Sequence, residues 1–292
     1  MDKIIRCITS DGAIMASAID STDIVYKASI IHKTSPVATA ALGRLLSATS
    51  MMGAMLKSKN ASINLRVAGD GPLGAVIAVA DSSGNVKGYV SNASCQTTRY
   101  ENGKLNVAAA VGKDGVLNVM KNLGEGEPYL GQTNLVSGEI AEDIANYYAV
   151  SEQIPTVCAL GVLVDKESAQ VLLSGGMLIQ LLPGADESTI EKLEKNVAQL
   201  DSVTTMLAKG MSTLDMCKEV LKGFEVEVLD EFPVKYVCGC SKEKIEALIE
   251  SMPKEEIEEM IEKDKGASAF CHFCNKKYEF TENELKEILK KK

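Results

Sequence analysis

The residues best suited to chemistry in this 292-residue chain are two pairs of cysteines near its C-terminal end. Cys238 and Cys240 are separated by one residue, and Cys271 and Cys274 by two. Thiolates are common ligands of Zn²⁺ in four-coordinate structural sites, and two close pairs joined by a longer spacer are a typical way for a chain to supply them. We therefore predict one zinc ion held by all four thiolates.

The same pairs make a redox reaction available. A zinc-bound cysteine is deprotonated, and the thiolate is the form that peroxide or hypochlorous acid attacks, although the metal also shields it. If the metal leaves, each cysteine has a partner thiol a few residues away along the chain, so two short-range disulfides can form. A zinc site with a purely structural role is the alternative explanation of this spacing.

A thiol-disulfide oxidoreductase that uses Cys271 and Cys274 is a second alternative. Catalytic pairs with this spacing begin a helix that follows a strand, whereas this pair precedes a β-like segment and has another cysteine pair as partner. We therefore expect no enzyme and no catalytic residue. His272 could replace one cysteine as a ligand, but four thiols already complete a tetrahedral site.

The remaining cysteines occur singly. Without a close partner along the chain, they are expected to be free thiols in or near the core rather than redox partners. They are Cys7, Cys95, Cys158 and Cys217.

Composition limits the classes of partner. A net charge of −9, a pI near 5.0 and the absence of Trp argue against nonspecific binding to nucleic acid or to an anionic membrane. The N-terminal residues lack the apolar core and small-residue cleavage site of a secretory signal. Eight cysteines in such a chain are expected in a reducing cytoplasm, as metal ligands or free thiols.

The first 183 residues predict an α+β core domain, mainly antiparallel, with buried helices. Short β-like runs follow one another, separated by Gly and Asn-Gly turns, which does not match an alternating βαβ pattern. Helices are expected at 37–57, after Ser35 and Pro36, and at 137–148. Strands are expected at 3–8, 13–19, 63–68, 75–80, 86–90, 105–111, 116–121, 157–164, 169–173 and 177–182.

Residues 184–232 predict an amphipathic helical linker segment. A capping box at Ser188–Glu191 begins a helix with apolar residues at helical spacing until Gly210, and a second helix is expected at 213–222. Residues 233–292 then predict a small C-terminal zinc-binding domain that could act as a redox switch, because few of its side chains are large and apolar.

Two other motifs have less specific patterns. Gly69–Gly74 matches the GxGxxG pattern of dinucleotide sites, but a β-like run follows where such a site needs a helix, so we expect a connection between strands. Glu139, Glu142 and Asp143 could form an acidic site. Carboxylates at this position are more typical of a helix start, where the helix dipole favours them.

The cysteine motifs and several other segments together resemble the redox-regulated 33-kDa heat-shock chaperone family. The segments are Cys238–Glu243 with Cys271–Cys274, Gly69–Pro72, Ser151–Pro155 and Gly175–Gln180, in the family's order and over nearly the whole chain. Asn275 departs from the glycine that often ends the zinc turn in this family. Asparagine tolerates a positive φ, so we expect the turn to be kept.

The resemblance implies a molecular chaperone that works without ATP. In this family zinc is bound in the reduced, inactive state, and oxidation forms two disulfides, Cys238–Cys240 and Cys271–Cys274. Zinc is then released, the C-terminal region unfolds, and apolar surface becomes available to unfolding client proteins. The resemblance also implies a homodimer of the oxidised form.

Overall fold

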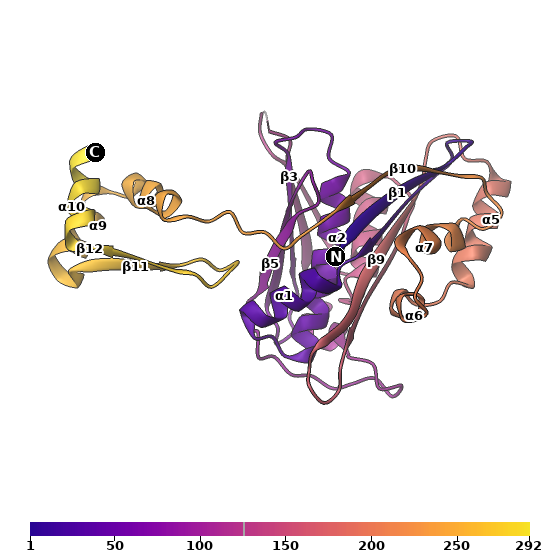
Figure 1. Ribbon diagram of the computed structural model, residues 1–292, viewed down its shortest axis with the longest axis horizontal. Helices are drawn as coiled ribbons and strands as arrows, with labels where there is room; N and C mark the ends of the chain where they lie inside the picture. The colour runs from indigo at the N-terminus through magenta and orange to yellow at the C-terminus, as the bar shows by residue number, and fades with distance from the viewer. Residues whose placement is uncertain (125) are drawn as a thin grey trace. The chain divides into compact units, whose positions relative to one another are not determined.

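The computed structural model describes residues 1–124 and 126–292 (Figure 1). They form two compact units, Met1–Val237 and Cys238–Lys292. Residues 184–232 belong to the first unit, and whether they can separate from it stays a prediction. None of the helices among the described residues has the length and apolar character needed to cross a bilayer.

The first unit contains two five-stranded antiparallel sheets. One has the order β10 (Val226–Pro233), β1 (Lys3–Thr9), β2 (Ile14–Asp20), β9 (Val171–Leu181) and β8 (Thr156–Val164). The other has the order β5 (Val86–Val90), β4 (Ala75–Asp81), β3 (Ser62–Ala68), β6 (Val116–Asn122) and β7 (Tyr129–Asn134). The predicted α+β class with mainly antiparallel strands is therefore confirmed.

Helix α2 (Pro36–Ala54) runs through the core of this unit and packs against strands of both sheets. Ser35 caps it by accepting a hydrogen bond from the amide of Ala38 at 3.3 Å, with Pro36 in its first turn, as the sequence predicts. All but two of its residues are buried, so this helix belongs to the core and has no face exposed to solvent.

Helix α1 (Thr22–His32) was not expected from the sequence, because its cap lies far away along the chain. The carboxylate of Asp2 accepts hydrogen bonds from the amides of Asp23 at 2.9 Å and Ile24 at 2.6 Å. Ser21, at the N-cap position, makes no side-chain capping bond. Asp20 adds a local contact by accepting a hydrogen bond from the amide of Thr22 at 3.1 Å, while the two amides that follow depend on the distant carboxylate of Asp2.

Three local predictions within residues 1–183 were wrong. Residues 105–111 are not a strand, because Asn106 caps the short helix α3 (Val107–Val111) by accepting a hydrogen bond from the Ala109 amide at 2.8 Å. The expected break within residues 173–177 does not exist: Gly175 and Gly176 continue β9 where a Cβ would clash with neighbouring atoms. Helix α4 (Ala141–Tyr147) starts later than 137 and continues into the π-helix η1 (Tyr148–Glu152).

Residues 184–232 hold α5 (Glu187–Ala198), α6 (Val203–Ala208) and α7 (Thr213–Val220) before entering β10. The single helix expected up to Gly210 is broken, because Ser202 caps a new helix by accepting from the Thr205 amide at 3.3 Å. The apolar faces of the three helices pack on the outer face of the first sheet in one cluster. Its fully buried members include Cys7, Ala16, Met177, Met216, Cys217 and Val220.

The second unit contains α8 (Lys242–Ser251), α9 (Lys254–Glu259), the π-helix η2 (Met260–Asp264), the hairpin β11 (Gly266–Phe270) and β12 (Lys277–Thr281), and α10 (Glu282–Lys291). Thr281 and Glu284 form the predicted capping box of α10. The buried core is small, and its members are Ile249, Ile257, Ile261, Tyr278, Phe280, Leu285 and Ile288.

Candidate metal centre

Two loops of the second unit bring the four predicted cysteines together. Cys238 and Cys240 lie in the irregular segment before α8, and Cys271 and Cys274 lie in the turn between β11 and β12. All four sulfur atoms lie within 4.8 Å of one another. Within the described residues, this is the only group of three or more His, Cys, Asp or Glu side chains with metal-ligand geometry, and it does not include His272.

The turn that carries the second pair is closed by backbone hydrogen bonds. The amides of Cys274 and Asn275 donate to the carbonyl of Cys271 at 3.3 and 2.8 Å, and the amide of Cys271 donates to the carbonyl of Lys276 at 3.0 Å. Asn275 has a φ of 55°, which asparagine tolerates better than most residues. The expectation that the turn survives without glycine at this position is confirmed.

The first pair is held by the start of α8. Ser241 caps this helix by accepting from the Lys244 amide at 3.3 Å, and the ammonium group of Lys244 donates to the carbonyl of Gly239 at 2.6 Å. Both bonds are local to residues 238–244, so the sequence that follows the pair fixes the direction of its loop. The single residue between the two cysteines is a glycine, which relieves crowding there.

The distances between the sulfur atoms suit a metal ion that is bound by four thiolates. The Sγ atoms of Cys240 and Cys274 are 3.3 Å apart, and those of Cys238 and Cys271 are 3.6 Å apart. With zinc–sulfur bonds of about 2.3 Å, the edges of a regular tetrahedron are about 3.8 Å long. The two measured separations are slightly shorter than that, so a small outward movement of the thiols would accommodate the metal.

A tyrosine completes the site. The hydroxyl of Tyr278 donates a hydrogen bond to Sγ of Cys240 at 3.0 Å. Burial alone would raise the pKa of Cys240, but the bonds from Tyr278 and the neighbouring thiols lower it to about 7. Burial raises the pKa of Cys274 to about 12 and also raises that of Cys238. Without a metal, Cys240 therefore loses its proton more easily than Cys238 and Cys274, and a metal needs all of its cysteine ligands as thiolates.

Tyr278 is the site residue that sequence reasoning missed. The sequence predicts it only as part of a short strand after the second pair. Its hydroxyl reaches a cysteine 38 residues earlier in the chain, and no local spacing signals that contact.

The single cysteines lie in the first unit as free thiols. Cys7, Cys95 and Cys217 are buried and Cys158 is partly buried, as expected for residues in or near the core. Cys7 and Cys217 do have a partner that the sequence does not reveal, because their thiols hydrogen bond to each other between β1 and α7.

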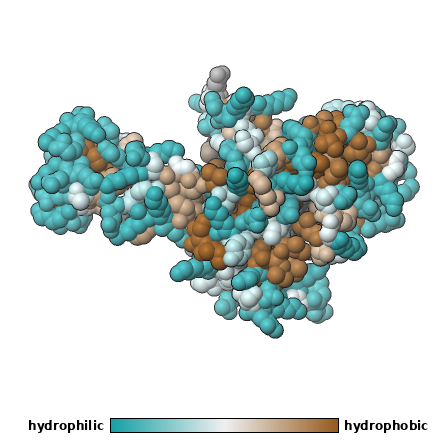
Figure 2. Space-filling model, in the orientation of Figure 1, coloured by the Kyte–Doolittle hydropathy of each residue, from teal (hydrophilic) through white to brown (hydrophobic). Residues whose placement is uncertain are grey.

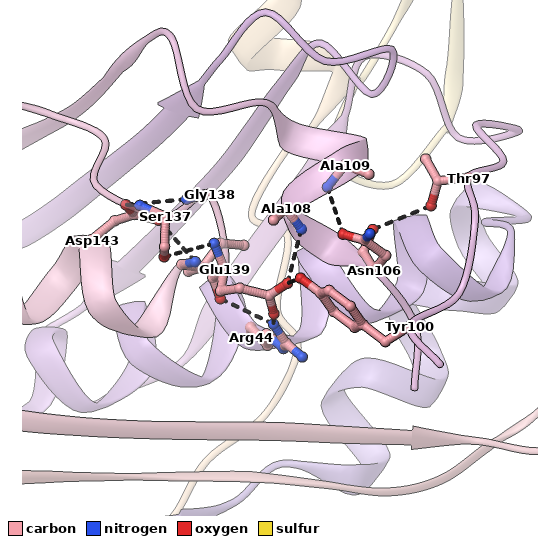
Figure 3. A network of polar contacts seen from close by, with 11 residues as sticks. Arg44, Thr97, Tyr100, Asn106, Ala108, Ala109, Ser137, Gly138, Glu139 and Asp143 are labelled. Carbon is pink, nitrogen blue, oxygen red and sulfur yellow. Dashed lines mark hydrogen bonds and ion pairs between the residues drawn. The ribbon is translucent and has the colours of Figure 1, made fainter. Parts of the chain in front are cut away.

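The carboxylates of Glu139 and Asp143 form hydrogen bonds and an ion pair with neighbouring segments of the chain (Figure 3). Asp143 accepts hydrogen bonds from the amides of Val136 at 2.8 Å, Ser137 at 3.0 Å and Ile140 at 2.9 Å, so the helix-start interpretation holds for this residue. Glu139 forms an ion pair with Arg44 of α2. The Gly69–Gly74 segment connects the antiparallel strands β3 and β4, as predicted.

Comparison with known proteins gives the family. The model of the Hsp33 protein family matches residues 2–281. The chain belongs to the Hsp33 protein family. It is 48% identical over 289 residues to the 33 kDa chaperonin of Clostridioides difficile, with 99% of each chain covered, and 45% identical to that of Alkaliphilus metalliredigens, with 98% of each covered.

A solved structure in the Hsp33 family agrees with the fold. The crystal structure of the 33 kDa chaperonin from Thermotoga maritima matches with a TM-score of 0.90 at 35% identity. The match covers 99% of this chain and 97% of that one. The predicted family resemblance is therefore confirmed, and the protein is a chaperone of this family with four clustered cysteines that can hold a metal ion.

Proposed function

We propose that this Hsp33 protein is a redox-regulated holdase whose C-terminal unit is kept folded by one zinc ion. In the reduced protein the ion is bound by Cys238, Cys240, Cys271 and Cys274, and the chaperone is inactive. Oxidation releases the ion and unfolds the unit. Apolar surface then binds unfolding client proteins in the cytoplasm and prevents their aggregation without ATP.

The observation that carries the proposal is the combination of four clustered thiols with a very small core. Seven buried apolar side chains support the 55 residues of Cys238–Lys292. Domains of this size usually need a metal or disulfides, and structural zinc supplies about 10–16 kcal/mol of apparent folding free energy. The face of this unit that Figure 2 shows is mostly hydrophilic.

The proposed oxidation joins neighbours in the sequence. Each thiol pair reacts with one peroxide molecule, which takes two electrons and two protons from the pair, so that one S–S bond and two waters form and two ligands are lost; oxidation of both pairs takes two peroxide molecules. Two sulfur contacts of the folded site run between the pairs, from Cys240 to Cys274 at 3.3 Å and from Cys238 to Cys271 at 3.6 Å. Disulfides within Cys238–Cys240 and Cys271–Cys274 are nevertheless favoured once the loops separate, because each closes a very short segment.

Residues 184–232 are proposed as the element that responds. Their helices cover an apolar face of the first sheet, and Leu193, Val203 and Met216 are among the side chains that make this contact. Hydrophobic patches are also visible on the surface of the first unit in Figure 2. Release of the segment would expose both its own apolar face and that of the sheet, which suits unfolding proteins and pairing of two oxidised chains.

The test follows metal, thiols and activity in one sample. Zinc and free thiols are counted in the full-length protein before and after peroxide with mild heat, and suppression of citrate synthase aggregation is measured. We expect the loss of one zinc and four thiols together with a gain of protection. Equal protection by the reduced protein would show that oxidation is not the control.

A thiol-disulfide oxidoreductase that uses Cys271 and Cys274 is the second candidate, although burial raises the pKa of Cys274 to about 12, which disfavours the thiolate that such an enzyme needs. Turnover in an insulin-disulfide reduction assay by protein with less than one zinc per chain would favour it. Protection of citrate synthase without such turnover supports the holdase and the absence of an enzymatic activity.

A further inference from the structure

A small basic cavity lies in the first unit among α2, the loop 99–105, β8 and the start of α6, with a volume of about 280 Å³. Four of its fifteen lining residues are basic and none is acidic, although the whole chain has 40 Asp and Glu against 31 Lys and Arg. The basic residues are Arg44, Arg99, Lys104 and Lys166. Such a local excess of positive charge in an acidic protein attracts anions.

Hydrogen bonds order the loop that carries two of these cations. The hydroxyl of Tyr100 donates to the carboxylate of Glu139 at 2.7 Å, beside the ion pair with Arg44 (Figure 3). The amide of Tyr100 donates to the carbonyl of Lys104 at 2.9 Å. The guanidinium of Arg99 donates to the carbonyl of Gly103 at 3.0 Å. Arg99 and Lys104 therefore lie on a loop that is held by its own hydrogen bonds and is connected to α2 through Glu139.

Ion pairs distinguish one of these four cations from the other three. Arg44 is paired with Glu139, whereas Arg99, Lys104 and Lys166 form no ion pair with any residue in the part of the chain that the structure describes. Positive charges gathered around one cavity repel one another, and an anion between them removes that repulsion. The cavity also has an apolar wall formed by Leu105, Leu160 and Val162 and two hydroxyl groups from Ser202 and Thr204.

We propose that this cavity binds a small organic anion. A phosphate or carboxylate head would meet the three unpaired cations, while an apolar body would lie against the leucine and valine side chains. The cavity volume of about 280 Å³ is just below the range of about 300–1,000 Å³ that is typical of ligand pockets, so the ligand should be a small metabolite.

The bound anion would connect the middle segment to the core. The start of α6 packs directly on β8, because a Cβ added to Gly161 would lie 2.9 Å from Cγ2 of Thr204. The hydroxyl side of the cavity belongs to residues 184–232 and the cationic side to the core. A ligand that binds only the docked arrangement stabilises it by mass action. This role rests on the proposed function, in which α6 leaves the core, and the anion then opposes activation.

Binding is tested on the reduced, zinc-loaded, full-length protein at constant ionic strength by titration calorimetry. The probes are phenyl phosphate, benzoate and inorganic phosphate, and the comparison of the first two shows which head the cavity prefers. We expect phenyl phosphate to bind more tightly than inorganic phosphate, because only the former has an apolar body. Absence of binding by all three probes would overturn the proposal.

Two double variants locate the site. The change Lys104→Gln with Lys166→Gln should weaken phenyl phosphate binding at least tenfold. The matched change Lys57→Gln with Lys59→Gln, at two exposed lysines after α2 that do not line the cavity, should leave affinity within twofold. Equal weakening by both double variants would show that the anion responds only to net charge and would overturn the site.

Hydrogen exchange tests the link to the middle segment. Phenyl phosphate should slow exchange of the amides in Val203–Ala208 in the unmodified chain and not in the Lys104/Lys166 variant. Unchanged exchange with saturating ligand would refute the link. Neither measurement uses oxidation or a client, so failure of the cavity leaves the proposed function standing, and failure of oxidative activation leaves the binding result standing.

Discussion

Replacing Leu285 by alanine tests whether metal binding and folding of the C-terminal unit are one equilibrium. Leu285 lies on α10 and is completely buried in the unit's small core. Removing a buried leucine side chain costs about 2–5 kcal/mol, because apolar contacts are lost and a cavity remains. If the metal-free unit is unfolded, zinc binding must supply that cost. A loss of about 3 kcal/mol corresponds to zinc binding about 150-fold weaker.

The assay is competition for zinc between the reduced full-length protein and a colorimetric chelator. Leu248→Ala is the matched control, because this leucine is in the same unit, on α8, and is 62% exposed. We expect zinc affinity to fall strongly for Leu285→Ala and to stay within about twofold for Leu248→Ala, since an exposed side chain contributes little to folding. Lower thermal stability of Leu285→Ala with unchanged zinc affinity would refute the coupling of folding to metal.

Three further predictions concern single side chains. Tyr278→Phe keeps the buried ring but removes the hydrogen bond to Cys240. Zinc affinity should therefore fall about 10- to 100-fold in the same competition assay. Unchanged affinity would contradict this role of the hydroxyl. Glu139→Gln leaves the largely buried Arg44 without its counter-charge. The free energy of unfolding, measured in urea, should therefore fall by about 2–4 kcal/mol, while zinc affinity is unchanged. A loss below about 0.5 kcal/mol would contradict a stabilising role of this ion pair. Burial raises the pKa of Asp2 to about 6 from 3.8, against the bonds from the amides of Asp23 and Ile24, so the folded state holds a proton that the unfolded state has released. The stability that this group contributes is therefore complete below pH 3.8 and is lost as pH rises through about 6. When the free energy of unfolding in urea is plotted against pH across that window, its slope should be less negative for Asp2→Asn than for the unmodified protein. Identical slopes would contradict the raised pKa of Asp2.

The metal centre was accessible from sequence because its chemistry is encoded locally. The ligands occur in two short motifs, and Ser241 and Asn275 next to them suit the cap and the turn that the structure shows. Tyr278 was not accessible, because its place beside Cys240 depends on how β12 packs within the unit. The contact between Cys7 and Cys217 depends in the same way on α7 lying over β1.

The errors in secondary structure have the same physical origin. At α1 and α3 the local caps Asp20 and Asn106 are supplemented by distant carboxylates, Asp2 and Glu139, which also accept hydrogen bonds from helix amides. The apolar spacing of 188–207 predicts one helix, because it continues across the break before Ser202. The basic cavity is equally invisible in sequence, since Arg44, Lys104 and Lys166 come from three separate parts of the chain.

The claim on which the proposed function depends is that the metal keeps residues 238–292 folded. The most direct measurement is hydrogen exchange followed by mass spectrometry on the reduced full-length protein, before and after complete removal of zinc by a chelator. We predict that amides of β11, β12 and α10 lose their protection while those of α2 keep it. A C-terminal unit that stays protected without the metal would contradict the account.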